Sequence, residues 1–210
     1  MKALVLFLFS ISSFAIDCNQ TYSPQKRKFK IEQGIELILN SSLKENNKLL
    51  FKSGPGVYGS YVTLDIPFEP VRKLYEQLKN FHPKLKTRGE AHITVLTPVE
   101  YFCIFRPEGT TINDLQKAIP NDILLNYKIL SMGNGYKGED DTSFVIVESH
   151  DLLNIRKTFG SLLKDSSKFN HSAFYPHITV GFTLRDFHLS DGVFKNEEYS
   201  RDSRFKITLK

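Results

Sequence analysis

The tetrapeptide His-Ile-Thr-Val occurs twice in this chain, at residues 92–95 and again at residues 177–180. Each copy lies in a segment whose side chains alternate with the period of a β-strand, and an amphipathic helix is predicted before each segment. The chain has only 6 histidines, so the use of one in each copy indicates a shared role. We therefore expect two related units, each ending in a strand that carries one copy.

Strand geometry places the histidine and the threonine of each copy on the same face. Successive side chains of a strand point to opposite sides, so His92 and Thr94 face one way while the intervening aliphatic residues face the other. The same holds for His177 and Thr179. The alternative is that both histidines are ordinary half-buried strand residues, which would be the preferred interpretation of a single His-x-Thr sequence.

Two imidazoles on either side of a phosphodiester suit acid–base chemistry near neutral pH. A neutral imidazole takes a proton from the attacking water or hydroxyl, and a protonated one gives a proton to the leaving oxygen. The hydroxyls of Thr94 and Thr179 can donate hydrogen bonds to the non-bridging oxygens as negative charge develops on them. This chemistry requires neither a metal ion nor another cofactor.

The order of predicted elements also repeats. In the first half a strand at residues 61–66 is followed by a helix around residues 71–78 and a strand at residues 91–96. The second half has strands at residues 124–132 and 142–147 around a glycine-rich connection at 133–138, then a helix around 152–162 and a strand at 175–182. Shorter helices are predicted at residues 31–39 and 112–119, the latter capped by Thr110 or Thr111. This order predicts an α+β fold of two related lobes.

The N-terminus has the pattern of a secretory signal. Lys2 precedes an apolar run at residues 3–11, and the small residues Ser13 and Ala15 follow. We expect a signal peptide at residues 1–15, cleaved after Ala15, and a secreted, extracellular protein without membrane association after cleavage. A membrane anchor needs about 20 apolar residues, and this run ends at Asp17.

The remaining chain is expected to consist of an N-terminal extension at residues 16–56 and one domain at residues 57–210. The extension begins with basic residues and ends in the cluster Lys-Ser-Gly-Pro-Gly at residues 52–56, which is typical of a boundary. The formal net charge of the whole chain is +5 and its isoelectric point is about 9.1. This charge mildly favours an anionic partner such as phosphate or nucleic acid.

Secretion affects how the cysteines and some asparagines are interpreted. Cys18 and Cys103 could form a disulfide in an oxidising compartment, or Cys103 could be a buried free thiol. Asn19, Asn40 and Asn170 begin glycosylation acceptor triplets, which are used only if a eukaryote secretes the chain. The other four histidines are expected on the surface, because their spacings match no compact zinc motif: His82, His150, His171 and His188.

Two segments resemble the paired motifs of the 2H phosphoesterase superfamily. They are Gly-Glu-Ala-His-Ile-Thr-Val at residues 89–95 and Tyr-Pro-His-Ile-Thr-Val at residues 175–180. The resemblance covers about residues 57–183. It implies a bilobal α+β fold, with two pseudo-symmetric sheet-and-helix lobes around a central cleft, and metal-independent cleavage of 2′,3′-cyclic or 2′,5′ phosphodiester linkages.

By this resemblance His92 and His177 become the acid–base pair, and Thr94 and Thr179 the phosphate-binding hydroxyls. We expect a monomeric phosphodiesterase that acts on the 2′,3′-cyclic phosphate ends of nucleotides or RNA without a cofactor or metal. Alternatives are a 3′→5′ exoribonuclease, a 2′,5′-oligonucleotide phosphodiesterase, or a non-catalytic nucleotide- or RNA-binding module. The secretion signal and the basic extension depart from the pattern of superfamily enzymes that act on intracellular RNA.

Overall fold

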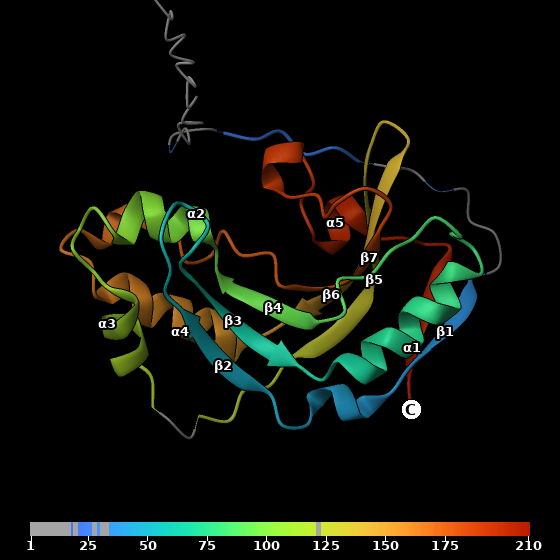
Figure 1. Ribbon diagram of the computed structural model, residues 1–210, viewed down its shortest axis with the longest axis horizontal. Helices are drawn as coiled ribbons and strands as arrows, with labels where there is room; N and C mark the ends of the chain where they lie inside the picture. The colour runs from blue at the N-terminus through green and yellow to red at the C-terminus, as the bar shows by residue number, and fades with distance from the viewer. Residues whose placement is uncertain (1–17, 19–20, 27–28, 30–33, 121–122) are drawn as a thin grey trace, which may run out of the picture.

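A computed structural model describes residues 18, 21–26, 29, 34–120 and 123–210 (Figure 1). The signal peptide expected at residues 1–15 lies outside these residues. The described chain forms two three-stranded antiparallel sheets and one pair of parallel strands, with helices packed around them. This is a mixed α+β architecture.

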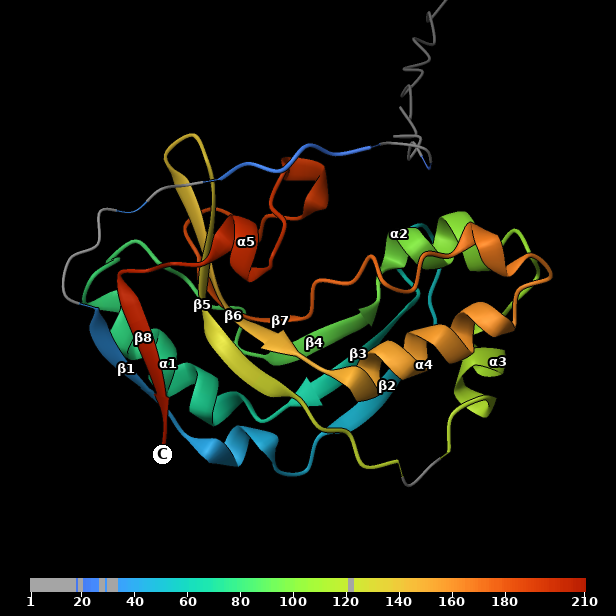
Figure 2. The same cartoon turned by 180° about the vertical axis from the view of Figure 1, so that it is seen from behind.

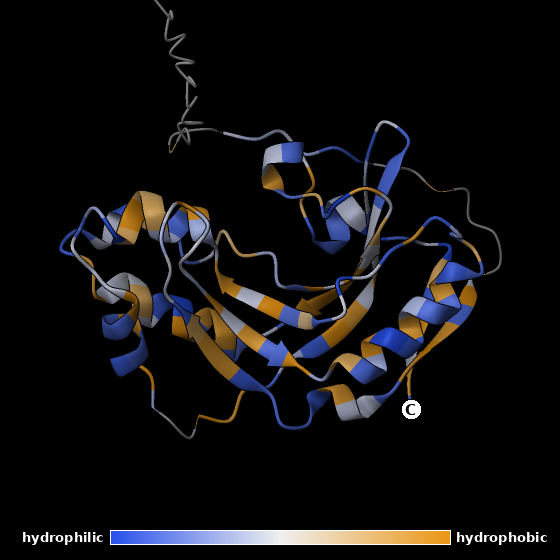
Figure 3. Cartoon of the chain, in the orientation of Figure 1, coloured by the Kyte–Doolittle hydropathy of each residue, from blue (hydrophilic) through white to orange (hydrophobic). Residues whose placement is uncertain are grey.

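The first sheet has the strand order β2 (Lys48–Lys52), β3 (Tyr61–Ile66) and β4 (Ala91–Leu96). Helix α1 (Phe68–Lys79) connects β3 to β4 and buries one apolar face. Hydrophobic residues alternate with more hydrophilic ones along β4, as Figure 3 shows. The predicted strands at residues 61–66 and 91–96 are thus present with the predicted bounds.

The second sheet has the strand order β5 (Lys128–Lys137), β6 (Asp140–Glu148) and β7 (His177–Phe182). Helix α4 (His150–Ser161) connects β6 to β7. Each sheet is therefore built in the order strand, strand, helix, strand. The edge strands β4 and β7 lie side by side where the two sheets meet (Figures 1 and 2).

The glycine-rich segment at residues 133–138 was expected to be a connection, but most of it belongs to β5. Only Gly138, with a φ of +63°, lies in the turn to β6. Gly133 and Gly135 allow close packing instead: a Cβ at Gly133 would lie 2.2 Å from the ring of Phe144. The glycines therefore serve the packing within the sheet, which the sequence pattern did not distinguish from a turn.

The predicted helix at residues 31–39 is also wrong over its described part. Residues 35–39 form β1 (Ile35–Leu39), which pairs in parallel with β8 (Phe205–Leu209) and buries Leu37 and Leu39. Together with β2, this strand makes the segment from residue 34 to residue 52 part of the folded body. The body thus begins well before residue 57, and the cluster at 52–56 is the hairpin between β2 and β3.

Shorter elements complete the fold. Thr111 caps α3 (Ile112–Lys117) by accepting a hydrogen bond from the backbone N–H of Asp114. The other short elements are α2 (Pro98–Glu100), a π-helical turn (Tyr101–Phe105), α5 (Glu197–Ser200) and 3-10 turns at Ser41–Lys44, Ser166–Lys168 and Leu189–Asp191. Within the described ranges, no helix has the length and apolar character needed to cross a membrane.

A disulfide joins Cys18 to Cys103 in the π-helical turn, with a Cα–Cα distance of 5.5 Å. Farther along the N-terminal segment, the backbone N–H of Gln25 donates to the carbonyl of Gly192 at 2.9 Å. In the N-terminal segment, Cys18 is therefore attached to the turn after α2, and Gln25 to the chain that follows β7.

Candidate active site

The first His-x-Thr pair lies on β4 as strand alternation predicts. His92 and Thr94 are partly exposed, whereas Ile93 and Val95 are fully buried in the core. On the neighbouring strand β3, Asp65 lies opposite His92, which places its carboxylate on the same face of the sheet. The Nδ1 atom of His92 is also 3.7 Å from Oε1 of Glu90. His92 therefore lies among carboxylates.

The second pair lies on β7 with the same alternation: His177 and Thr179 are partly exposed, and the residues between and after them are buried. The Nδ1 atom of His177 is 2.7 Å from the carbonyl oxygen of Tyr175, and its Nε2 atom is 3.0 Å from Nζ of Lys195. The ring also packs edge-on against Phe144, with centroids 5.7 Å apart. Both ring nitrogens of His177 thus have a partner.

A buried carboxylate, Asp186, organises the cluster around the second pair. Its Oδ1 atom accepts hydrogen bonds from Lys195 Nζ at 2.7 Å and from Thr142 Oγ1 at 2.8 Å. Its Oδ2 atom accepts from Thr179 Oγ1 at 3.0 Å and from an Arg88 guanidinium nitrogen at 3.2 Å. Asp186 is 4% exposed and Lys195 3%, so this is a buried ion pair with its hydrogen bonds satisfied.

Asp186 also links the two motifs electrostatically. Its negative charge favours the protonated form of both His92 and His177, and Arg88, which is bonded to it, lies four residues before His92. The adjacency of β4 and β7 and this shared carboxylate place the two motifs in one polar cluster. We call His92, Thr94, His177, Thr179, Asp186 and Lys195 the two-motif cluster.

The two histidines differ in their electrostatic surroundings. Burial and the positive charge of Lys195 lower the pKa of His177 to about 3. Burial also lowers the pKa of His92, but the carboxylates of Glu90, Asp186 and Asp65 oppose this shift. Burial alone would raise the pKa of Asp186, yet the neighbouring Lys195 and histidines hold it below its usual range. The surroundings thus oppose protonation of His177 more strongly than protonation of His92.

The two threonines also differ. The single hydroxyl proton of Thr179 is donated to Asp186, so this hydroxyl must rotate before it can donate to a phosphate oxygen. Within the described part of the chain, the Thr94 hydroxyl makes no hydrogen bond to protein. Thr94 is therefore free to donate to a substrate oxygen without breaking an existing contact.

A buried arginine links the end of β4 to the loop that precedes β7. Arg156, on α4 and 1% exposed, donates to the carbonyl of Val95 at 2.8 Å and pairs with Glu100 at 2.7 Å. It also donates to the carbonyl of His171 at 3.0 Å, in the loop that leads to β7. One side chain thus connects the strand that carries the first motif to the loop that precedes the second.

Several residues of this polar site were not identified by the sequence analysis. Lys195, Asp186 and Arg88 belong to no recognisable motif, and the spacing of Lys195 from His177 gives no signal. His188, expected at the surface, is exposed. Burial of its ring lowers the pKa of His188 to about 4, and its protonated form would oppose protonation of His177. His150 is exposed as well, whereas the two other non-motif histidines are half-buried: His82 and His171.

The remaining candidate positions lie away from the two-motif cluster. Asn40 and Asn170 are exposed, and the side-chain oxygen of each accepts a hydrogen bond from the backbone two residues on. Asn19 lies outside the described residues. No group of three or more histidine, cysteine, aspartate or glutamate residues that could hold a metal ion occurs in the ranges described above.

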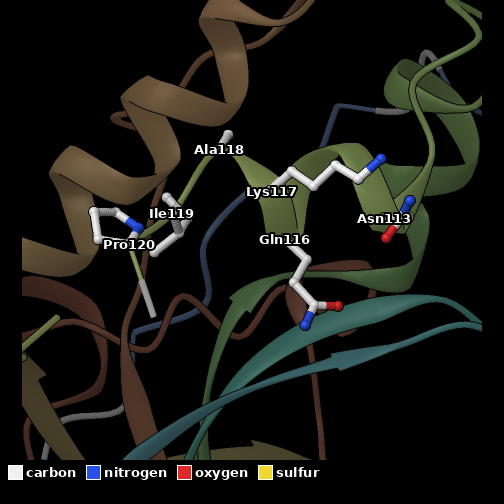
Figure 4. Close-up of a pocket in the computed structure, with 6 residues that line it drawn as sticks. All are labelled: Asn113, Gln116, Lys117, Ala118, Ile119 and Pro120. Carbon is white, nitrogen blue, oxygen red and sulfur yellow. The ribbon is translucent and has the colours of Figure 1, made fainter. Parts of the chain in front are cut away.

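A surface pocket of about 550 Å³ lies at the end of α3, and no residue of either motif lines it (Figure 4). Its lining has one charged side chain, Lys117, and no nucleophile or acid–base pair. The lining residues are Asn113, Gln116, Lys117, Ala118, Ile119 and Pro120. The pocket therefore has none of the histidines and buried carboxylates that the two-motif cluster brings together.

Comparisons with known proteins agree with the motifs. Residues 60–188, more than half of the chain, match the family model described as "Swiss Army Knife, 2H phosphoesterase domain". No curated protein and no solved structure matches the chain. The matched region contains both His-x-Thr pairs and Asp186, and it supports a phosphoesterase activity in the broad sense. The chain belongs to the 2H phosphoesterase family.

Proposed function

We propose that this protein is a phosphodiesterase that opens 2′,3′-cyclic phosphates at the ends of nucleotides or RNA by two-histidine acid–base catalysis. The observation that carries the proposal is the placement of His92 and His177 on two strands that lie side by side. Each histidine has a threonine two residues later on the same face of its strand. A neutral imidazole and a second imidazole able to carry a proton are what such a reaction requires.

The reaction can be written with one water and no other reactant. A neutral imidazole takes a proton from water while the water oxygen bonds to phosphorus. The P–O bond to one ribose oxygen breaks, and the protonated imidazole gives its proton to that oxygen. The product is a nucleoside 2′- or 3′-monophosphate, and one further proton exchange with solvent restores both histidines.

Charge on the phosphate can be stabilised by groups already in the cluster. The free hydroxyl of Thr94 can donate to a non-bridging oxygen, as can Thr179 after rotation away from Asp186. Arg88, whose side chain is 33% exposed, can contribute a guanidinium from the edge of the cluster. The net charge of +5 is favourable for a polyanionic substrate.

We further propose that the chain is secreted, because its first 15 residues have the pattern of a signal peptide. A disulfide between Cys18 and Cys103 is compatible with an oxidising compartment. N-terminal sequencing of exported protein should give Ile16 as the first residue, and an intact Met1 on exported protein would contradict the proposal.

The direct test of the activity is turnover of 2′,3′-cyclic nucleotides in the presence of EDTA, with separation of 2′- from 3′-monophosphate. We expect turnover that EDTA does not reduce and a single monophosphate isomer. Binding without turnover would favour a nucleotide-binding module instead. Loss of turnover in EDTA, restored by zinc or magnesium, would favour metal-dependent catalysis.

A further inference from the structure

We propose that Lys195, anchored by Asp186, is a positioning residue that keeps Nε2 of His177 unprotonated, so that His177 is the general base and His92 the general acid. This inference rests on the proposed function, since it assigns the two roles within that reaction. It adds a residue that neither the His-x-Thr motif nor the sequence spacing singles out.

The hydrogen bonds of His177 fix its protonation state. Nδ1 can only donate to the carbonyl oxygen of Tyr175, 2.7 Å away, because a carbonyl has no proton to give. Nε2 faces the Nζ of Lys195 at 3.0 Å, and an ammonium has donors only. The ring therefore carries its proton on Nδ1 and accepts at Nε2, which is the neutral tautomer with a lone pair at Nε2.

The proton between Nε2 of His177 and Nζ of Lys195 belongs to Lys195. An amine is intrinsically more basic than an imidazole by about 4 pKa units. Nζ is also held at 2.7 Å by the carboxylate of Asp186 and lies 5.1 Å from the ring centroid of Phe144, and both contacts favour the ammonium form. Burial lowers the pKa of Lys195, but the carboxylate of Asp186 opposes this shift. The ammonium form of Lys195 opposes protonation of His177.

The charged groups around His177 differ from those around His92. His177 faces the cation Lys195, the carboxylate Asp186 and, from the loop after β7, His188. His92 faces three carboxylates, Glu90, Asp65 and Asp186, against the single cation Arg88. A proton on the pair is therefore better accommodated by His92. This asymmetry makes His92 the donor to the leaving oxygen and His177 the acceptor from water.

Substrate binding must free the lone pair of Nε2. An anionic phosphate oxygen is a stronger acceptor for an ammonium than a neutral imidazole nitrogen is. A small rotation of the Lys195 side chain toward the phosphate, with Asp186 still bound, would release Nε2 to take the proton of the attacking water. In the free enzyme, Lys195 thus keeps Nε2 of His177 unprotonated. When substrate binds, the phosphate draws the ammonium away and leaves Nε2 open to the water.

The test compares wild type with Lys195→Met, which keeps the length of the side chain and removes its charge. The midpoint of the His177 imidazole titration, followed by NMR, should rise, because a cation is lost and Asp186 remains. At pH 5 the neutral fraction of His177 should then fall, and kcat/KM with it by roughly tenfold if the midpoint reaches about 6. The basic limb of the plot of kcat/KM against pH, which reports the titration of His92, should not shift.

Two further variants control for folding and for unspecific charge effects. The double variant Lys195→Met with Asp186→Asn removes both charges of the buried ion pair and leaves only the partly exposed Arg88 without its partner. It should therefore fold and show a smaller rise in the His177 midpoint. Lys137→Met removes an exposed lysine, 57% accessible and paired with Asp191, on β5 at the other edge of the same sheet. It should leave both the His177 midpoint and kcat/KM unchanged.

The opposite assignment makes the opposite prediction. If His177 were the acid, a rise of its pKa would increase the protonated fraction, and Lys195→Met would raise kcat/KM on the acid side. That result, or a His177 midpoint that does not move in either variant that carries Lys195→Met, would overturn the inference. A wild-type protein without turnover on any phosphodiester would refute the proposed function and the base role, whereas the midpoint would still report the contact between Lys195 and His177.

Discussion

Replacement of Arg156 by methionine should strongly destabilise the protein. The side chain is 1% exposed, pairs with Glu100, and donates to backbone carbonyls of Val95 and His171. Its guanidinium also lies 4.6 Å from the ring centroid of Phe169. Removal of one partner of a buried ion pair leaves an uncompensated charge and typically costs about 3–5 kcal/mol. We expect a loss of this size in the free energy of unfolding.

Urea unfolding with the disulfide intact measures this loss. Arg72→Met is the matched control, because Arg72 pairs with Glu69 and Glu76 on the exposed side of α1, and such surface pairs contribute below about 1 kcal/mol. Adding Glu100→Gln to Arg156→Met should recover part of the loss, since it removes the partly buried charge left behind. A loss for Arg156→Met no larger than that for Arg72→Met would refute the view that this arginine holds β4 to the loop before β7.

Two further predictions concern the threonines and the disulfide. Thr94→Val should lower the rate by about 100-fold without changing the free energy of unfolding. Thr179→Val should also lower the free energy of unfolding by about 1–3 kcal/mol, because it removes a donor to the buried Asp186. Equal stability of the two variants would contradict this prediction. Replacing Cys18 and Cys103 by serine opens a loop with a sequence separation of 85. Urea unfolding should then show a free energy of unfolding lower by up to about 4–5 kcal/mol. An unchanged free energy would contradict a stabilising role of the disulfide.

The sequence was most informative where local pattern and tertiary environment agree. The alternation at residues 91–96 predicted a half-buried strand, and the structure buries Ile93 and Val95 there while His92 stays accessible. It was misleading for residues 35–39, where a short apolar run is compatible with either a helix or a strand. Their strand conformation depends on pairing with Phe205–Leu209 at the far end of the chain.

The buried charges could not be predicted for a related reason. Lys195 and Asp186 look like surface residues in the sequence, because lysine and aspartate are rarely buried without a partner. Each is buried only because the fold supplies the other at 2.7 Å. Arg156 likewise interrupts the apolar face of α4, and its partners come from β4 and from the loop before β7. These contacts exist only once the two sheets meet.

The measurement that tests the two-histidine site most directly is kcat/KM of His92→Ala and of His177→Ala on a 2′,3′-cyclic nucleotide in EDTA. Each variant should lose a factor of roughly 10²–10⁴, the range for one positioned acid or base. The double variant should lose less than the product of the two factors, because the residues act as one unit. A folded single variant that retains full activity on cyclic and 2′,5′-linked substrates would contradict the account.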